Sequence, residues 1–115
     1  MSFKKKKIDN RLERIFLRKY PGIIFLLDET GKYLELIKLV IPEKQRNQGL
    51  GTKIMIGLCE EADRYKKILT LTPTNIYGSD FKRLIKFYKK FGFVMNEGKN
   101  QINIIDSEMY RKIKL

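Results

Sequence analysis

The chain of 115 residues contains no histidine, and Cys59 is its one cysteine. Without histidine, Ser-His-Asp and Cys-His catalytic machinery and imidazole metal ligands are excluded. A lone cysteine excludes an intrachain disulfide and a cysteine-based metal site. The apolar runs are too short to span a bilayer, and the N-terminal lysines do not resemble a signal peptide. We therefore expect a metal-independent domain in the reducing cytoplasm.

Length and composition predict one compact domain over residues 1–115. The hydrophobic fraction of 43% and the aromatic fraction of 11% are sufficient to fill a core, which argues against wholesale disorder.

Positive charge is concentrated at the two ends of the chain. The net charge is +12; residues 1–20 carry eight Lys and Arg against two acids, and residues 81–115 carry nine against three. This distribution favours a polyanionic partner such as nucleic acid, an acidic protein or a phosphorylated cofactor. The alternative is that the charge serves only solubility, and the lysines of residues 4–7 then form a solvated, mobile tail.

Hydrophobic periodicity predicts an α/β domain with the element order α-β-β-α-β-α-β-β and a mixed central sheet. We expect helices over residues 10–20, from about residue 50 to residue 65, and after a Ser79 cap, where the helix ends at Gly92. The strands are expected at residues 23–28, 33–41, 68–71, 93–95 and 102–110. The loop of residues 96–100 separates the last two.

The segment that follows the second expected strand has the features of an anion-binding loop. Gly49 and Gly51 flank the expected start of a helix, where unpaired backbone N–H groups and the helix dipole favour a phosphate. It is neither a P-loop nor a dinucleotide-binding glycine motif. The alternative is an ordinary strand-to-helix turn with two glycines.

Three segments together resemble the GNAT family of acetyl-CoA-dependent N-acetyltransferases. Residues 46–51 (RNQGLG) match the family's pyrophosphate motif, and residues 84–93 (LIKFYKKFGF) match its Tyr…Gly-Phe signature. Residues 92–101 and 107–111 look like the C-terminal strands of small members from bacteriophages and mobile elements. Because only residues 1–22 precede the first hairpin, the resemblance implies a minimal, N-terminally shortened GNAT-like fold.

The resemblance also implies a site for acetyl-CoA. Its pyrophosphate would lie on the backbone N–H groups of the loop, and its pantetheine arm would pair with the strand edge, next to a parallel strand at residues 68–71 that splays away. The cofactor-binding residues implied are Leu39, Val40, Ile41, Arg46, Asn47, Gln48, Gly49, Leu50, Gly51 and Thr52. No metal is implied.

Two side chains carry the implied chemistry, which is direct attack of an amine on the thioester. Tyr88 stands at the family's tyrosine position and is the candidate general acid for the departing thiolate; the alternative is a core aromatic. Glu35 is the candidate general base, on a strand face expected to be shared with Leu39 and Ile41. The alternatives are an exposed strand carboxylate and a chain of water molecules as the base.

The predicted function is acetyl transfer to a primary amine, with an acidic macromolecule as the expected acceptor because the basic ends of the chain would attract it. Two alternatives are a basic nucleic-acid- or protein-binding module with this fold and no turnover, and an adaptor that binds coenzyme A. Helix-turn-helix and RNA-recognition signatures are absent, which disfavours nucleic acid as the partner.

Overall fold

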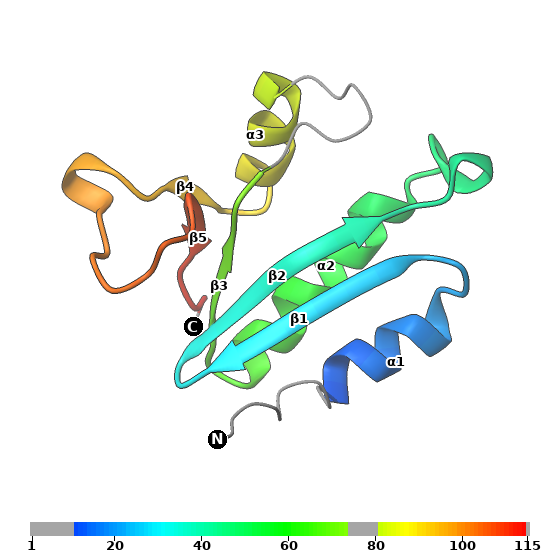
Figure 1. The fold of residues 1–115 in the computed structure, drawn as a ribbon, viewed down its shortest axis with the longest axis horizontal. Helices are drawn as coiled ribbons and strands as arrows, with labels where there is room; N and C mark the ends of the chain where they lie inside the picture. Colours follow the sequence, from blue (N-terminus) through cyan, green and yellow to red (C-terminus); the bar gives the residue numbers. More distant parts are fainter. Residues whose placement is uncertain (1–10, 74–80, 115) are drawn as a thin grey trace.

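The computed structural model describes residues 11–73 and 81–114, and the elements follow in the predicted order (Figure 1). The expected Ser79 cap lies outside the described residues. In those ranges, no helix combines the length and the apolarity needed to cross a bilayer. The helices are α1 (Arg11–Lys19), α2 (Leu50–Arg64) and α3 (Phe81–Lys89), and the strands are β1 (Ile24–Thr30), β2 (Tyr33–Val40), β3 (Ile68–Leu71), β4 (Val94–Met95) and β5 (Met109–Arg111).

The strands form one mixed sheet in the order β1-β2-β3-β5-β4. The β1–β2 hairpin is antiparallel, β2 and β3 are parallel, and β5 is antiparallel to both β3 and β4. The predicted α/β class and mixed sheet are confirmed. The parallel pairing of β2 with β3 is also confirmed, and it requires the crossover that α2 supplies.

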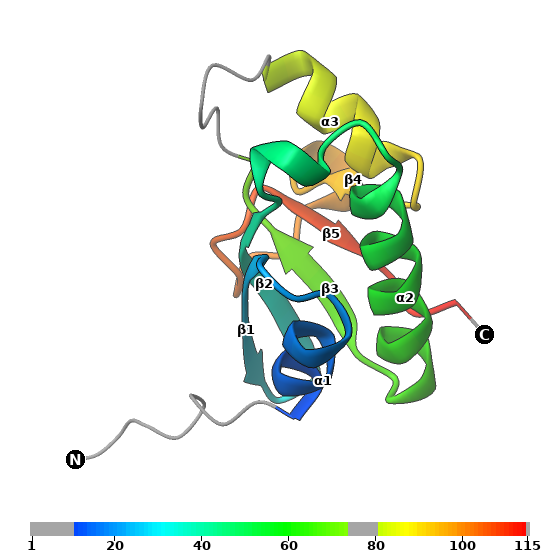
Figure 2. The same ribbon diagram turned by 90° about the vertical axis from the view of Figure 1, so that its right-hand side faces the viewer.

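The three described helices lie on one face of the sheet, and the opposite face is left open over β1 and β2 (Figure 2). Phe16 of α1 stacks on Phe25 of β1 with ring centroids 5.1 Å apart. The Glu13 carboxylate accepts a hydrogen bond from the backbone N–H of Leu27 at 2.8 Å, which ties α1 to the edge strand. The core between the layers includes Leu34, Leu36, Ile54, Met55, Leu58, Leu69, Leu71, Phe93 and Met109.

A β-bulge in β2 changes which side chains share a face. Leu26 pairs with Lys38 and Leu27 pairs with Leu36, so Ile37 is an extra residue on β2 without a partner. One inserted residue shifts the alternation of side chains by one position. The prediction that Glu35 shares a face with Leu39 and Ile41 is therefore wrong. Leu39 and Ile41 pack on the core side with the helices, and Glu35 faces the open side.

The last predicted strand, residues 102–110, is also corrected. The structure has a strand only at Met109–Arg111, preceded by a long irregular connection from residue 96. The Asn96 side chain organises this connection by accepting a hydrogen bond from the Ile102 N–H at 2.6 Å and donating one to the Ser107 carbonyl at 3.0 Å. Because the apolar side chain of Ile104 is 77% exposed, alternating hydrophobicity was a misleading strand signal here.

An ion pair joins the C-terminal strand to α2. The Arg111 guanidinium donates to both carboxylate oxygens of Asp63, at 2.8 and 3.0 Å, and to the Phe91 carbonyl at 2.8 Å. The Lys114 N–H donates to the same carboxylate. The hydrogen bonds from Arg111 hold the pKa of Asp63 below its ordinary value. Arg111 is only 8% exposed, so its positive charge is compensated by the Asp63 carboxylate and not by solvent.

We expect Asp63→Asn to lower the free energy of unfolding by about 3 kcal/mol, because loss of one partner leaves a buried charge unpaired. Glu61→Gln is the matched control: the Glu61–Arg64 pair is 3.7 Å long and largely exposed, so its loss should cost under about 1 kcal/mol. Urea unfolding measures both. Because the pKa of Asp63 is lowered, its contribution is present above about pH 4 and is lost as the pH falls through the folded-state pKa. Equal effects of the two substitutions would contradict this account.

Candidate functional site

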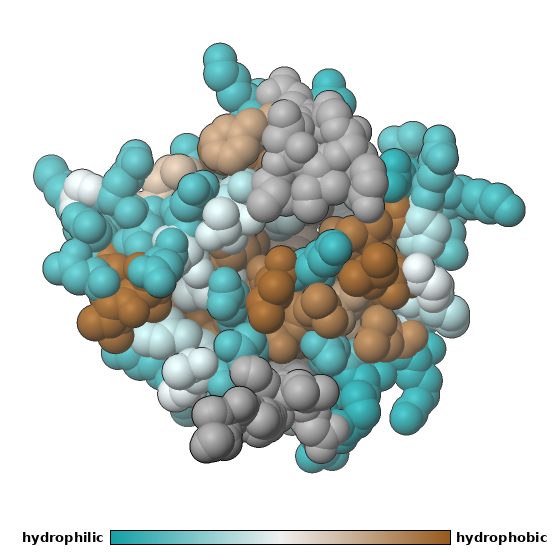
Figure 3. All heavy atoms as spheres, in the orientation of Figure 1, coloured by the Kyte–Doolittle hydropathy of each residue, from teal (hydrophilic) through white to brown (hydrophobic). Residues whose placement is uncertain are grey.

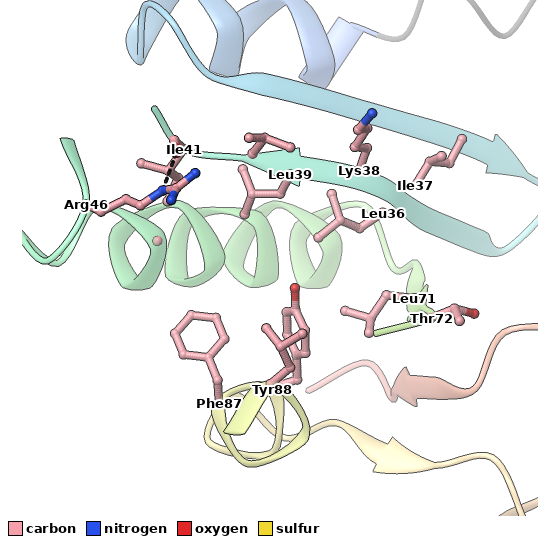
Figure 4. Close-up of a pocket in the computed structure, with 13 residues that line it drawn as sticks. Leu36, Ile37, Lys38, Leu39, Ile41, Arg46, Leu71, Thr72, Phe87 and Tyr88 are labelled. Atoms are coloured by element: carbon pink, nitrogen blue, oxygen red, sulfur yellow. Dashed lines mark hydrogen bonds between the residues drawn. The ribbon is translucent and has the colours of Figure 1, made fainter. Parts of the chain in front are cut away.

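A cavity opens where β2 and β3 diverge. The parallel pairing runs from Tyr33 opposite Ile68 to Leu36 opposite Leu71. Among the described residues, the rest of β2 pairs only with β1. The cavity of about 300 Å³ lies between β2, the end of β3 and the helices (Figure 4). It is lined by Leu36, Ile37, Lys38, Leu39, Val40, Ile41, Arg46, Gly51, Leu71, Thr72, Leu84, Phe87 and Tyr88.

Beside this cavity, the N-terminus of α2 presents a run of unused hydrogen-bond donors. In the described part of the chain, no hydrogen bond engages the backbone N–H groups of residues 47–52. Asn47 and Gly49 have positive φ angles of 62° and 76°, and such left-handed turns direct successive N–H groups toward one point. Asparagine tolerates this conformation better than most residues. The arrangement, at the start of a 15-residue helix, is suited to an anion.

The first residue of the loop, Arg46, does not offer its backbone N–H to a ligand, contrary to the prediction. The Arg46 N–H donates to the Glu43 carbonyl at 3.2 Å in a short 3-10 turn, so it is already used. The side chain compensates, because Arg46 Nε donates to the Ile41 carbonyl at 2.8 Å and this contact holds the guanidinium at the cavity (Figure 4). Arg46 is basic, and the described residues that line the cavity include no acidic one, so the cavity favours a negatively charged ligand. The Lys38 ammonium is directed away from the cavity (Figure 4).

Gly51 lies where the backbone approaches the cavity wall. A Cβ at this position would lie 3.2 Å from Ile41 Cδ1 and 3.7 Å from Phe87 Cζ, so a side chain would crowd two lining residues. By contrast, a Cβ at Gly49 would meet nothing within 4 Å. Gly51 therefore keeps the cavity open, and Gly49 supplies the turn before the helix.

Tyr88 rises from α3 into the cavity, with its hydroxyl directed toward β2 (Figure 4). Its ring packs edge-on against Phe87 and Phe93, at centroid distances of 5.3 and 5.9 Å. The ring of Tyr88 packs on the core, and its hydroxyl end lines the cavity. The side chain is therefore a core aromatic whose hydroxyl also stands where the candidate acid was expected. Burial raises the pKa of Tyr88 above its ordinary value, so the phenol stays protonated at neutral pH.

Glu35 lies apart from this cavity. It lines a second cavity of about 480 Å³ on the open face of the sheet, while its neighbour Leu36 lines the first. Glu35 is opposite Thr70 in the pairing of β2 with β3, one residue before the strands separate. The two candidate catalytic residues therefore lie on opposite sides of the point where β2 and β3 diverge.

Six of the predicted site residues come together around the first cavity: Leu39, Val40, Ile41, Arg46, Gly51 and Tyr88. Asn47, Gln48, Gly49, Leu50 and Thr52 do not line it, and approach it only as the N-terminus of α2. The sequence interpretation missed Leu36, Leu71 and Phe87. Phe87 had no helical-stripe signal, and Leu36 and Leu71 were predicted only as strand residues because the end of the strand pairing was not visible in the sequence.

One comparison with known proteins identifies the fold family. A family model described as an acetyltransferase (GNAT) domain matches residues 11–95, which include β1, β2, α2, β3 and α3. The search of curated proteins found no match.

Proposed function

The chain belongs to the GNAT acetyltransferase family, and we propose that it transfers the acetyl group of acetyl-CoA to a primary amine. The observation that supports the proposal most strongly is the row of unengaged N–H groups at residues 47–52. It lies beside a basic-lined cavity that ends where two parallel strands diverge. Acetyl-CoA carries a pyrophosphate, an extended pantetheine arm and a thioester in this order. The N–H groups, the cavity and the point where the strands diverge follow one another in the same order.

The binding roles follow from the chemistry of the lining. The N–H groups of residues 47–52 would donate to the pyrophosphate, with the Arg46 guanidinium adding positive charge. The edge of β2 at Leu39–Ile41, which has no partner strand on the β3 side in the described residues, would pair with the amide groups of the pantetheine arm. Unpaired strand edges accept such an added chain readily.

Tyr88 would supply the proton that the leaving group needs. When bound, acetyl-CoA supplies an acetyl group activated as a thioester. The Tyr88 hydroxyl is protonated at neutral pH because burial raises its pKa, and it is directed toward β2 at the point where pairing with β3 ends (Figure 4). It would donate its proton to the sulfur as the C–S bond breaks and recover one from solvent.

Glu35 would act at the point where β2 and β3 diverge, on the opposite face of the sheet from Tyr88. Its carboxylate faces the open side of the sheet, where an amine has access without passing the helices. An ammonium group must lose a proton before its nitrogen can attack, and Glu35 would accept it. Leaving group and nucleophile are thus served by two separate side chains, which is compatible with direct transfer without a covalent enzyme intermediate.

We expect acetyl-CoA at one hundred times its Kd to raise the free energy of unfolding by about 2.7 kcal/mol, seen as a higher melting temperature. Acetyl-pantetheine is the control, because it carries the same thioester but lacks the pyrophosphate that the α2 N-terminus would bind. It should give a much smaller shift at equal concentration. Equal shifts from both compounds, or none from acetyl-CoA, would contradict the assignment.

A further inference from the structure

The second cavity has the opposite charge to the first. It lies on the open face of the sheet, near the β1–β2 turn, and has a volume of about 480 Å³, which is within the usual range for a small-molecule site. Three carboxylates and one ammonium line it, in a chain whose net charge is +12. The lining residues are Asp28, Thr30, Gly31, Lys32, Tyr33, Glu35, Thr70, Ile104, Ile105, Asp106 and Ser107.

The strand register places the centre of this cavity beside the proposed reaction point. Asp28, Glu35 and Thr70 are consecutive partners across β1, β2 and β3, and they share the open face. The next row, on the core face, includes Leu36 and Leu71, the last pair before the strands separate. Glu35 makes no ion pair with any described residue. A cation bound in the cavity would give its carboxylate a partner.

A buried hydroxyl provides an observation independent of the carboxylates. Thr70 is only 2% exposed, lines the cavity, and lies on the opposite face from Leu69 and Leu71, which pack in the core. Its hydroxyl makes no hydrogen bond within the described part of the chain. Ser107, 8% exposed, lines the same cavity. Buried polar groups are normally hydrogen-bonded, so one directed into a cavity indicates a ligand that is a hydrogen-bond donor or acceptor.

We propose that this cavity receives the acceptor, and that the acceptor is a small amine with more than one ammonium group, such as an alkyl diamine or polyamine. The proposal rests on the proposed acetyl transfer and specifies its acceptor. Asp28, Glu35 and Asp106 bind the ammonium groups, and Thr70 accepts a hydrogen bond from one of them. The exposed side chain of Ile104 and the half-buried side chain of Ile105 suit the methylene segments.

The negative charge of this cavity favours a small cationic acceptor over a basic protein and over an acidic macromolecule. A basic protein would be repelled by the net charge of +12. An acidic macromolecule, the acceptor expected from the basic ends of the chain, would bring its carboxylates against those of the cavity. Figure 3 shows this open face, with apolar side chains gathered over β1 and β2; Ile24, Leu26 and Ile37 are the large exposed apolar residues there.

The transfer balances with one amine and one thioester. The reacting ammonium releases one proton to Glu35 and becomes the free amine. Its nitrogen forms the new N–C bond as the C–S bond breaks, and it then loses its second proton to solvent. The thiolate takes a proton from Tyr88, which recovers one from solvent. The remaining ammonium groups keep their charge and stay bound to the other carboxylates. A monoamine of similar length lacks that second contact, so it should bind more weakly.

The first experiment measures spermidine binding by calorimetry in the absence of acetyl-CoA, so the readout does not depend on turnover. Asp106→Asn should weaken spermidine binding about tenfold or more, as loss of a charge-assisted hydrogen bond does, and leave acetyl-CoA affinity unchanged. Glu60→Gln is the matched control, because Glu60 is an exposed carboxylate on α2 outside this cavity. Equal loss in both variants would overturn the proposal.

The second experiment uses Thr70→Val, which keeps the shape and removes the hydroxyl. If Thr70 were merely structural, the variant would leave spermidine binding unchanged. We expect it to leave the melting temperature equal or higher, because an unpartnered buried hydroxyl is removed, and yet to weaken spermidine binding several-fold. A stable variant with unchanged spermidine affinity would overturn the role of Thr70.

The outcomes separate this proposal from the proposed function. If spermidine binds in the cavity and acetyl-CoA does not bind, the cation site stands and the acetyltransferase assignment fails. If acetyl-CoA binds and a lysine in a glutamate-rich peptide is acetylated faster than spermidine, with no effect of Asp106→Asn, the acetyltransferase stands and the cationic acceptor is wrong. Turnover of butylamine with the same specificity constant as spermidine also overturns it.

Discussion

Replacing Tyr88 with Phe should lower kcat by roughly one hundred- to ten thousand-fold, the usual contribution of one positioned general acid. The ring packs against Phe87 and Phe93, and Phe preserves those contacts. The substitution removes only the hydroxyl that lines the cavity. Acetyl-CoA affinity, measured by calorimetry, should therefore stay within about twofold of the unsubstituted protein, since the proposed phosphate contacts lie at α2. Steady-state kinetics measures the change in kcat.

Tyr65→Phe is the matched control, because Tyr65 is 53% exposed at the end of α2 and far from any proposed chemistry. It should change neither kcat nor affinity. Because burial raises the pKa of Tyr88, the loss of activity caused by its ionisation should begin only above pH 10, its ordinary value. Full activity of Tyr88→Phe, or equal losses in both variants, would contradict the role of this hydroxyl.

Gly49→Asp should reduce acetyl-CoA affinity by about two to three orders of magnitude, because juxtaposed like charges cost several kcal/mol. A Cβ at this position meets no atom within 4 Å, so the side chain has space in the folded protein. Its carboxylate would lie at the α2 N-terminus, where the phosphates would bind. Calorimetry with acetyl-CoA measures the loss.

Gly49→Asn separates charge from backbone strain. The φ of 76° at Gly49 strains both substitutions to a similar extent, and Asn has the same shape as Asp without the charge. Asn should therefore retain most of the affinity, and the two variants should have similar melting temperatures without ligand. Equal loss of affinity in both would show that conformation, and not phosphate binding, explains the effect.

The order of the elements was predictable because each helix has a clear apolar stripe, the strand at residues 23–28 is bounded by turn residues, and β3 at residues 68–71 ends before Pro73. The β-bulge at Ile37 was not predictable. It depends on how β2 pairs with β1, and no local pattern marks the inserted residue. This single residue places Glu35 on the opposite face from Leu39.

The cofactor side of the candidate site was visible in the sequence because its signal is local: two glycines, an asparagine and an arginine within six residues. The proposed acceptor side was not visible in the sequence. Asp28, Thr70 and Asp106 come from three segments far apart in the chain, and the register that aligns Asp28 with Thr70 through Glu35 is a tertiary feature. The positive charge at the two ends of the chain therefore indicated an acidic acceptor, although the local charge of the open-face cavity is negative.

The most direct test of the account is to incubate the protein with acetyl-CoA and spermidine and to measure free thiol and acetylated amine together, by a thiol reagent and by mass spectrometry. The account predicts that thiol release depends on the amine, that thiol and acetylspermidine appear in equal amounts, and that Tyr88→Phe lowers both together. Thiol release that is the same with and without spermidine, or that occurs with no acetylated amine from spermidine, butylamine or a lysine peptide, would contradict acetyl transfer to an amine.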